Sequence, residues 1–296
     1  MLLTIHILLI FHLIQIFRNL PLEELARMSF VLSHDQGGCR FIQRIIEQND
    51  SFTNDLLFPF LQPNLIEVMN DSFGNYLIQK MIEKLNEVNF KQLLEKVNKN
   101  FYMLAKNPQG TRVIQKFLEY TNDDFLKKNL TQYALDLLKD NNGYHIILKY
   151  SNLQKKAEFI EKIIETHMLE IATNKFGCCA IQKYLQLYPS EAIIKKIILH
   201  TEELIINIYG NYVIQFIISL NDQDYNMQII EKFKKNICFL SKQKFSSNVI
   251  ERCFDHCLPS VKNILINYIC EEKVVEELLL DMYGNYGKYI IYNILY

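Results

Sequence analysis

Residues 73–82 read FGNYLIQKMI, and residues 209–218 read YGNYVIQFII. Six further stretches follow the same pattern: GGCRFIQRII at 37–46, QGTRVIQKFL at 109–118, NGYHIILKY at 142–150, FGCCAIQKYL at 176–185, FSSNVIERCF at 245–254 and YGNYGKYIIY at 283–292. Their anchor residues, spaced 33 to 38 residues apart, are Gly38, Gly74, Gly110, Gly143, Gly177, Gly210, Ser246 and Gly284. A nearly constant spacing over eight units indicates an internal repeat that organises the chain.

Each unit has one apolar-periodic stretch on either side of its anchor. The stretch before the anchor is amphipathic, as in FKQLLEKVNKNFYMLAKN at 90–107, and the stretch after it is again helical in period. Two helices per repeat with a short turn predict an all-α solenoid, in which each repeat is buried against its neighbours. The nine Gly and six Pro are too few for a turn-rich all-β fold or a Gly-rich nucleotide-binding enzyme.

The repeat domain is predicted to span residues 21–296, with repeats at about 21–56, 57–92, 93–128, 129–160, 161–193, 194–228, 229–264 and 265–296. Residues 1–17 are almost wholly apolar, apart from His6, His12 and Gln15. A membrane span needs about 20 apolar residues, and a secretory signal would place a basic residue before Arg18. We therefore expect residues 1–20 to be an apolar capping helix, with a targeting or anchor segment as the alternative.

The overall charge identifies no partner. The 32 basic and 33 acidic residues leave a net charge of −1, so a nucleic-acid function must come from local patterning. Seven cysteines without a C-x-x-C motif argue against a disulfide framework and predict a reducing, cytoplasmic location. Cys253, His256 and Cys257 lack further ligands nearby in the sequence, so we expect them to lie on a buried helix face, with no metal and no cofactor.

The helix after each anchor has a regular register when it is numbered from the residue that follows the anchor. Positions 3, 4, 7 and 8 are apolar, as in Val213, Ile214, Ile217 and Ile218, and predict the packed face of the helix. Positions 1 and 5 lie one turn apart on a separate row, with positions 2 and 6 beside them. We call positions 1 and 5 the reader pair, position 2 the stacking row and position 6 the basic row.

These rows carry polar, flat and cationic side chains in turn. The reader pairs are Cys39/Gln43, Asn75/Gln79, Thr111/Gln115, Tyr144/Leu148, Cys178/Gln182, Asn211/Gln215 and Ser247/Glu251. The stacking row is Arg40, Tyr76, Arg112, His145, Cys179, Tyr212 and Asn248. The basic row is Arg44, Lys80, Lys116, Lys149, Lys183, Phe216 and Arg252. We expect its six cations to contact the phosphates of an RNA backbone. Hydrogen-bonding edges, stacking planes and cations side by side are the chemistry of single-stranded RNA recognition.

The motifs CRFIQ, NYLIQ, TRVIQ, NYVIQ and SNVIE resemble the base-reading helices of the Pumilio/PUF family of RNA-binding proteins. The resemblance covers about residues 17–296, all eight repeats, and IFRNLPLEELARMS resembles the family's N-terminal cap. It implies a right-handed crescent of eight repeats that reads one base per repeat. It also implies that the RNA runs antiparallel to the chain, with its 5′ end at repeat eight.

The chemistry of the base edges suits these pairs. The Glu251 carboxylate can accept both the N1–H and the N2–H of guanine, with Ser247 beside it. Two amides match uracil, and one Gln can satisfy adenine or uracil, so its small partner must help to decide between them. With the family's polarity, the implied element is 5′-U-G-U-A-N-A-U-A-3′.

Three repeats depart from the family's pattern. Tyr144 and Leu148 leave repeat four without a polar reader, and this gives the N. Cys179 replaces an expected stacking side chain in repeat five. Repeat eight allows two registers: alignment on GNY makes Asn285 and Tyr289 the readers and Tyr286 the stacker, whereas a three-residue shift selects Lys288, Tyr289 and Tyr292.

The predicted function is therefore binding to 3′ untranslated regions of mRNA, followed by repression or decay through recruited deadenylase or other repressor proteins. We expect a monomer with no membrane partner. One alternative is a nucleolar PUF-like ribosome-assembly factor, and another is a HEAT- or armadillo-like scaffold for proteins. An enzyme is not expected, because His145 is the only histidine in the expected groove and no nucleophile, carboxylate pair or phosphate loop accompanies it.

Overall fold

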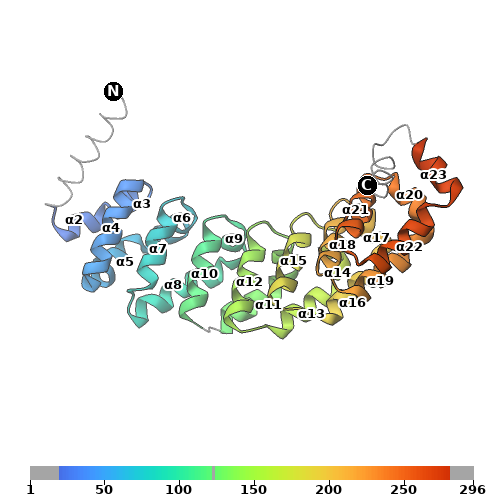
Figure 1. The fold of residues 1–296 in the computed structure, drawn as a ribbon. Coiled ribbons are helices and arrows are strands. Elements are labelled where there is room, and N and C mark those ends of the chain that lie inside the picture. The colour runs from blue at the N-terminus through green and yellow to red at the C-terminus, as the bar shows by residue number, and fades with distance from the viewer. Residues whose placement is uncertain (1–19, 122–123, 281–296) are drawn as a thin grey trace, which may run out of the picture. The chain divides into compact units, whose positions relative to one another are not determined.

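The computed structural model describes residues 20–121 and 124–280, and every regular element in those ranges is a helix. Figure 1 shows the described helices, and the chain divides into two compact units. Unit one runs to Leu137 and includes Asn141–Lys155, and unit two comprises Leu138–Asp140 and the chain from Lys156 onward. The prediction of an all-α repeat fold is confirmed. The predicted cap at 1–20 lies, except for Leu20, outside the described residues.

The elements of unit one follow the repeats in order. Repeat one holds α2 (Leu22–Arg27), α3 (Ser29–Ser33) and α4 (Gln36–Gln48). The π-helical η1 (Phe52–Leu57), α5 (Phe58–Leu61), the 3-10 turn η2 (Gln62–Asn64), α6 (Leu65–Asn70) and α7 (Gly74–Ile82) follow. Next come α8 (Glu87–Lys99), α9 (Phe101–Lys106), α10 (Gly110–Tyr120), α11 (Asp124–Leu138) and α12 (Gly143–Leu153).

Unit two continues the same plan. Repeat five holds α13 (Glu158–Thr166), α14 (Met168–Ala172) and α15 (Gly177–Leu187), and repeat six holds α16 (Glu191–Leu199), α17 (Thr201–Ile205) and α18 (Gly210–Ser219). Repeat seven holds α19 (Gln223–Phe233), η3 (Lys234–Asn236), α20 (Ile237–Ser241) and α21 (Ser246–His256). The last described helices are α22 (Pro259–Ile269) and α23 (Glu272–Leu279).

The first helix of most repeats is broken, where the sequence pattern predicted one continuous helix. The break falls ten residues before the anchor, at Asn64, Asn100, His167, His200 and Asn236, where φ is between −113° and −98° and ψ between 12° and 23°. This is the bridge region of the backbone map, which ends one helix and starts the next. Repeat four has Tyr133 at the equivalent place, and α11 runs through it unbroken.

A side-chain cap starts the second helix of repeats one, two, three, five and six. The N–H of Gly38 and that of Gly74 each donate, at 2.7 Å, to a carboxylate three residues earlier, Asp35 and Asp71. Asn107, Asn174 and Asn207 accept the corresponding bond from Gly110, Gly177 and Gly210 at 2.9–3.0 Å. Because the first N–H groups of a helix have no partner within it, these short acceptors fix where each reader helix begins.

The anchor is small because the chain passes close to it. A Cβ at Gly74 would lie 2.6 Å from the carbonyl oxygen of Val68, and one at Gly38 would lie 2.7 Å from that of Leu32. In repeat seven the anchor is Ser246, whose hydroxyl donates to the carbonyl of Leu240, again six residues earlier, at 2.7 Å. The serine therefore accommodates the same close approach by turning the crowded carbonyl into a hydrogen-bond partner.

The apolar register builds the core of each unit. In unit one, α4, α7, α10 and α12 pack in sequence, and in unit two α15, α18 and α21 do the same (Figure 1). Val213, Ile214, Ile217 and Ile218 are all fully buried, as their register predicts. Phe41 and Ile45 of repeat one are only half-buried and line a cavity of about 530 Å³ with Leu22 and Leu25.

The described residues hold no membrane-spanning helix, disulfide or metal cluster. No helix there has the length and apolar character needed to cross a bilayer. All seven cysteines are free. In the same ranges no three His, Cys, Asp or Glu side chains gather as a metal site would require.

Candidate nucleic-acid interface

The first member of each described reader pair is buried, and in repeats one and three it ties its helix to the backbone of the next repeat. The Cys39 thiol donates to the carbonyl of Phe73 at 3.1 Å, and the Thr111 hydroxyl donates to that of Asn142 at 3.2 Å. Both acceptors immediately precede the anchor of the following repeat. Position 1 therefore stabilises the stacking of neighbouring repeats in addition to any part in recognition.

The asparagines at position 1 have a fixed orientation. Asn75 is fully buried, and its Nδ2 donates to the carbonyls of Asp71 and Ser72 at 2.9 and 3.1 Å. Asn211 repeats this arrangement with Asn207 and Ile208 at 2.8 and 3.0 Å. Since both N–H groups of each amide are used by the backbone, only Oδ1 points toward position 5.

This oxygen orients the glutamine at position 5. Gln79 Nε2 donates to Asn75 Oδ1 at 3.0 Å, and Gln215 Nε2 donates to Asn211 Oδ1 at 2.9 Å. The other three glutamines donate Nε2 to position 1 as well: Gln43 to Cys39 Sγ, Gln115 to Thr111 Oγ1 and Gln182 to the Cys178 carbonyl, at 3.0, 3.4 and 3.0 Å. Each half-buried glutamine thus has Oε1 and one N–H left for a ligand.

An acceptor beside a donor is the edge that both uracil and adenine match. Uracil offers a ring N–H beside a carbonyl oxygen, and adenine offers an amino N–H beside a ring nitrogen, so one fixed amide fits either base. The sequence could not show that the buried residue at position 1 holds the orientation of the glutamine at position 5, which is the half-buried member of the pair. The direct base contact expected of Cys39, Asn75, Thr111, Cys178 and Asn211 stays a prediction.

Repeat seven presents a different edge. Ser247 is 4% exposed and donates its hydroxyl to the carbonyl of Lys244 at 3.3 Å. The half-buried Glu251 carboxylate makes no hydrogen bond or ion pair with any other described residue. Two free oxygens on one side chain form a double acceptor, as guanine recognition requires.

The stacking row is exposed along both units, at Arg40, Tyr76, Arg112, His145, Cys179, Tyr212 and Asn248. Two cavities in unit one lie between these side chains and the reader pairs. One, of about 380 Å³, is lined by Cys39, Arg40, Gln43 and Tyr76 together with the turn before α7. The other, of about 220 Å³, is lined by Tyr76, Gln79, Arg112 and Gln115, with Lys116, Glu119 and Lys149 at its border. Each is a slot with a polar edge and a flat side chain.

Tyr76 and Arg112 also contact each other. The guanidinium carbon of Arg112 lies 5.9 Å from the centre of the Tyr76 ring, and its NH1 donates to the Tyr76 hydroxyl at 2.7 Å. Both planes are therefore held beside the slot between repeats two and three. In repeat four, Tyr144 is 8% exposed, its ring centre lies 4.0 Å from that of His145, and Leu148 is half-buried. This pair presents an apolar surface where the other repeats present a polar edge.

The basic row is not a row of unpaired cations. Lys80, Lys116 and Lys149 each form an ion pair with a glutamate of the preceding repeat: Glu47, Glu83 and Glu119, at 2.9, 2.9 and 2.6 Å. Arg44 and Lys183 are exposed, and Arg252 NH1 lies 2.9 Å from His256 Nε2. The sequence analysis missed these glutamates, although Glu47, Glu83 and Glu119 recur every 36 residues at position 9. Asn285, Tyr286 and Tyr289 of repeat eight lie outside the described residues.

Comparison with known proteins agrees with this architecture. The family model of the NOP9-like PUF repeat domain matches residues 18–284. A Pumilio domain-containing protein of Schizosaccharomyces pombe is 33% identical over 277 residues, which are 90% of this chain and 40% of the relative. Pumilio homolog 12 of Arabidopsis thaliana is 32% identical over 270 residues, with 87% and 45% covered. This chain thus spans about half the length, or less, of these two relatives.

Solved structures with the same fold carry RNA. The Puf4 RNA-binding domain bound to the HO endonuclease RNA 3′ UTR recognition sequence has a TM-score of 0.75 and 30% identity, covering 89% of this chain and 85% of that one. The Puf3 RNA-binding domain bound to site B of the Cox17 RNA 3′ UTR has a TM-score of 0.70 and 29% identity, with 94% and 85% covered.

The fold and the repeated rows define an α-solenoid of PUF repeats, a non-catalytic class of domain. The chain belongs to the family of NOP9-like PUF repeat domains.

Proposed function

We propose that the chain binds single-stranded RNA sequence-specifically, with one base per repeat, at elements like 5′-U-G-U-A-N-A-U-A-3′ in mRNA 3′ untranslated regions. The observation that supports this most directly is the reader glutamine, held in five repeats by its position-1 partner with an acceptor and a donor left over. The similar Puf4 and Puf3 domains, whose structures contain 3′ UTR sequences, support the class of ligand.

The downstream role belongs to the same proposal. A cytoplasmic monomer would deliver its bound mRNA to deadenylase or other repressor proteins. The second, third and fourth bases of the element are assigned to repeats seven, six and five. Glu251 with Ser247 binds G, Gln215 with Asn211 binds U, and Gln182 binds A. Repeat four, with its apolar pair, accepts any base.

A titration tests the proposal. Labelled U-G-U-A-A-A-U-A should bind more tightly than the same RNA with A-C-A in place of U-G-U. The guanine that Glu251 reads is absent from this RNA, and losing that edge at about 1–3 kcal/mol predicts a difference of about 5- to 150-fold. Equal affinities at fixed salt would refute the proposed function.

A matched pair of variants locates the binding to the reader row. Gln79→Ala removes a reader amide and should weaken binding by about 1–3 kcal/mol, or about 5- to 150-fold. Gln92→Ala, on the outer helix α8, removes an exposed glutamine whose Oε1 accepts from Gln62 at 3.0 Å, and should leave RNA affinity unchanged. Equal effects of the two variants would place the RNA elsewhere.

A ribosome-assembly role is the second candidate, because the matching family model is the NOP9-like one. Selection from a pool that mixes random single strands with random hairpins separates the two roles. Recovery of single strands with U-G-U-A supports mRNA binding, whereas recovery of structured RNA without that element supports ribosome assembly. The regular reader pairs of repeats one to three and five to seven favour the first.

A further inference from the structure

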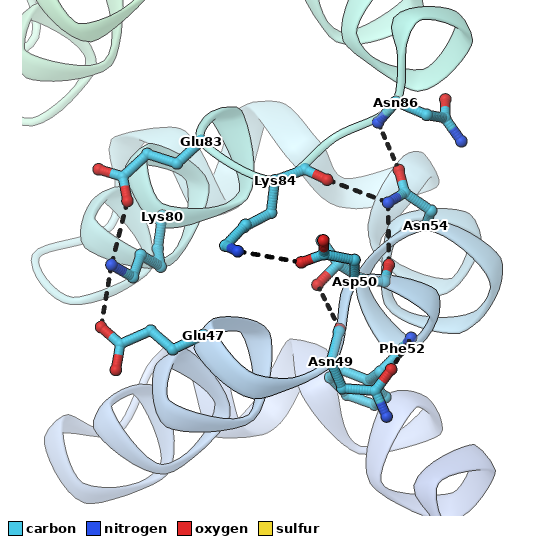
Figure 2. Close-up of polar contacts among 10 residues, drawn as sticks. Glu47, Asn49, Asp50, Phe52, Asn54, Lys80, Glu83, Lys84 and Asn86 are labelled. Carbon is cyan, nitrogen blue, oxygen red and sulfur yellow. Dashed lines mark hydrogen bonds and ion pairs between the residues drawn. The ribbon is translucent and has the colours of Figure 1, made fainter.

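Six alternating charges run along repeats one to four, beside the reader pairs of unit one. We call Glu47, Lys80, Glu83, Lys116, Glu119 and Lys149 the ion-pair ladder. Figure 2 shows its first part, where Lys80 Nζ lies 2.9 Å from Glu47 and 3.0 Å from Glu83. Lys116 Nζ then lies 2.9 Å from Glu83 and 3.4 Å from Glu119, and Lys149 Nζ lies 2.6 Å from Glu119.

The contacts within the ladder favour the charged forms of Lys80, Glu83, Lys116 and Glu119. Hydrogen bonds to Glu47 and Glu83 raise the pKa of Lys80, and the hydrogen bond to Glu83 raises that of Lys116. Burial opposes the charge of Glu83, but hydrogen bonds from Lys116 and Lys80 outweigh it and lower the pKa of this carboxyl. The hydrogen bond from Lys149 lowers the pKa of Glu119. Three lysines and three glutamates therefore leave the ladder without net charge.

The ladder borders the place where a base would enter. The cavity lined by Gln79 and Gln115 is also lined by Lys116, Glu119 and Lys149. An RNA strand in this slot would bring its phosphates near Lys116 and Lys149, whose charges are already paired with glutamates. It would also bring them near Glu119, which is negatively charged like the phosphates. Phosphate contacts give most of the affinity of a protein for RNA of any sequence, so their suppression matters here.

We propose that Glu47, Glu83 and Glu119 lower the affinity of the chain for RNA of any sequence by withholding Lys80, Lys116 and Lys149 from phosphates. Binding then depends on the reader pairs. The glutamates act through the lysines and contact no base. This inference rests on the proposed function. It assigns to glutamates outside the reader pairs a role in reducing binding to RNA of the wrong sequence.

The expected effect follows from counterion release. Each lysine freed to contact a phosphate of a single strand should steepen the salt dependence of log affinity by about 0.7. Over the tenfold range from 1 M to 0.1 M salt, this slope raises the affinity about fivefold for each freed lysine. Glu83→Gln with Glu119→Gln frees Lys116 and Lys149 and should raise the affinity for an unrelated RNA about 25-fold at 0.1 M salt.

The experiment compares this double variant, the milder Glu119→Gln, and Glu87→Gln as the control. Glu87 also pairs with a lysine, Lys91, at 2.7 Å, but on the exposed outer helix α8. Affinities for U-G-U-A-A-A-U-A and for a cytidine octamer are measured at several salt concentrations, and elution from a heparin column provides a readout that needs no RNA. Circular dichroism shows which variants fold.

The inference predicts steeper salt dependence and later heparin elution for the ladder variants, with Glu87→Gln like the unchanged chain. If folded Glu119→Gln and the double variant match the control in both readouts, the ladder only joins neighbouring repeats and the inference is wrong. Failure of the proposed function is a separate result, because it would show as equal binding of the two octamers by the unchanged chain.

Discussion

Exchanging the reader pair of repeat seven should change the base that this repeat selects. Ser247→Asn with Glu251→Gln installs the pair found at Asn75/Gln79 and Asn211/Gln215. The structure offers the new asparagine the same partners. Asn75 and Asn211 donate to the carbonyls four and three residues earlier, and in repeat seven these belong to Gln243 and Lys244. Lys244 already accepts a hydrogen bond from Ser247.

The magnitude follows from the two edges. The Glu251 carboxylate offers guanine two acceptors, whereas a glutamine oriented like Gln79 offers one acceptor and one donor, so one guanine proton would face an N–H. Losing this match should cost about 1–3 kcal/mol, and uracil should gain a similar amount from the new edge. The combined change of about 2 kcal/mol or more is a change in preference of about thirtyfold or more.

Fluorescence anisotropy at fixed salt with U-G-U-A-A-A-U-A and U-U-U-A-A-A-U-A measures the change directly. The unchanged chain should prefer the first RNA and the double variant the second. The preference for uracil at the third base, assigned to Asn211 and Gln215, is the internal control and should not change. A double variant that keeps its preference for guanine, or that loses all RNA binding while folded, would refute the one-repeat, one-base assignment.

Two further predictions concern stability. Gly74→Ala should destabilise the chain by about 1–3 kcal/mol in urea denaturation, because the new Cβ would lie 2.6 Å from the Val68 carbonyl oxygen; an unchanged midpoint would contradict this account of the anchor. The lowered pKa values of Glu83 and Glu119 mean that the ladder stabilises the fold above their ordinary value of 4.5 and loses this contribution as pH falls through the lower, folded-state values. The unfolding temperatures of the unchanged chain and of Glu83→Gln/Glu119→Gln should therefore differ at pH 7 and converge as pH falls from 4.5 through the lower, folded-state values; a constant difference would contradict the ion-pair origin.

The repeat spacing and the apolar register predicted the reader helices correctly, because burial at positions 3, 4, 7 and 8 depends only on helical period. The break in the first helix was not predicted, because a single residue in the bridge region hardly changes the spacing of the apolar residues on either side of it. A recurring Asn or His ten residues before the anchor, as at Asn100 and His167, was the available signal. Tyr133, in the repeat whose helix is unbroken, supports this interpretation.

The polar rows were harder to predict than the core. The sequence grouped Asn75 with Gln79 but could not show that the asparagine is buried, since this depends on how the next repeat packs over it. Lys116 was predicted to face phosphate, and its pairing with Glu83 joins residues 33 positions apart in the sequence. Such a contact is fixed by the offset between neighbouring helices, which the motif of one repeat does not contain.

The structure also shows why reader pairs reuse so few residue types. Cys39 donates to the backbone of repeat two at Phe73 and accepts from Gln43, so one small side chain joins two repeats and orients a reader. Thr111 does both through its hydroxyl, with Asn142 and Gln115 as partners. In repeats one and three, a substitution at position 1 must therefore keep a donor for the next repeat and an acceptor for the glutamine within a buried space. Few side chains are short and able to do both, and this requirement restricts position 1 independently of any base.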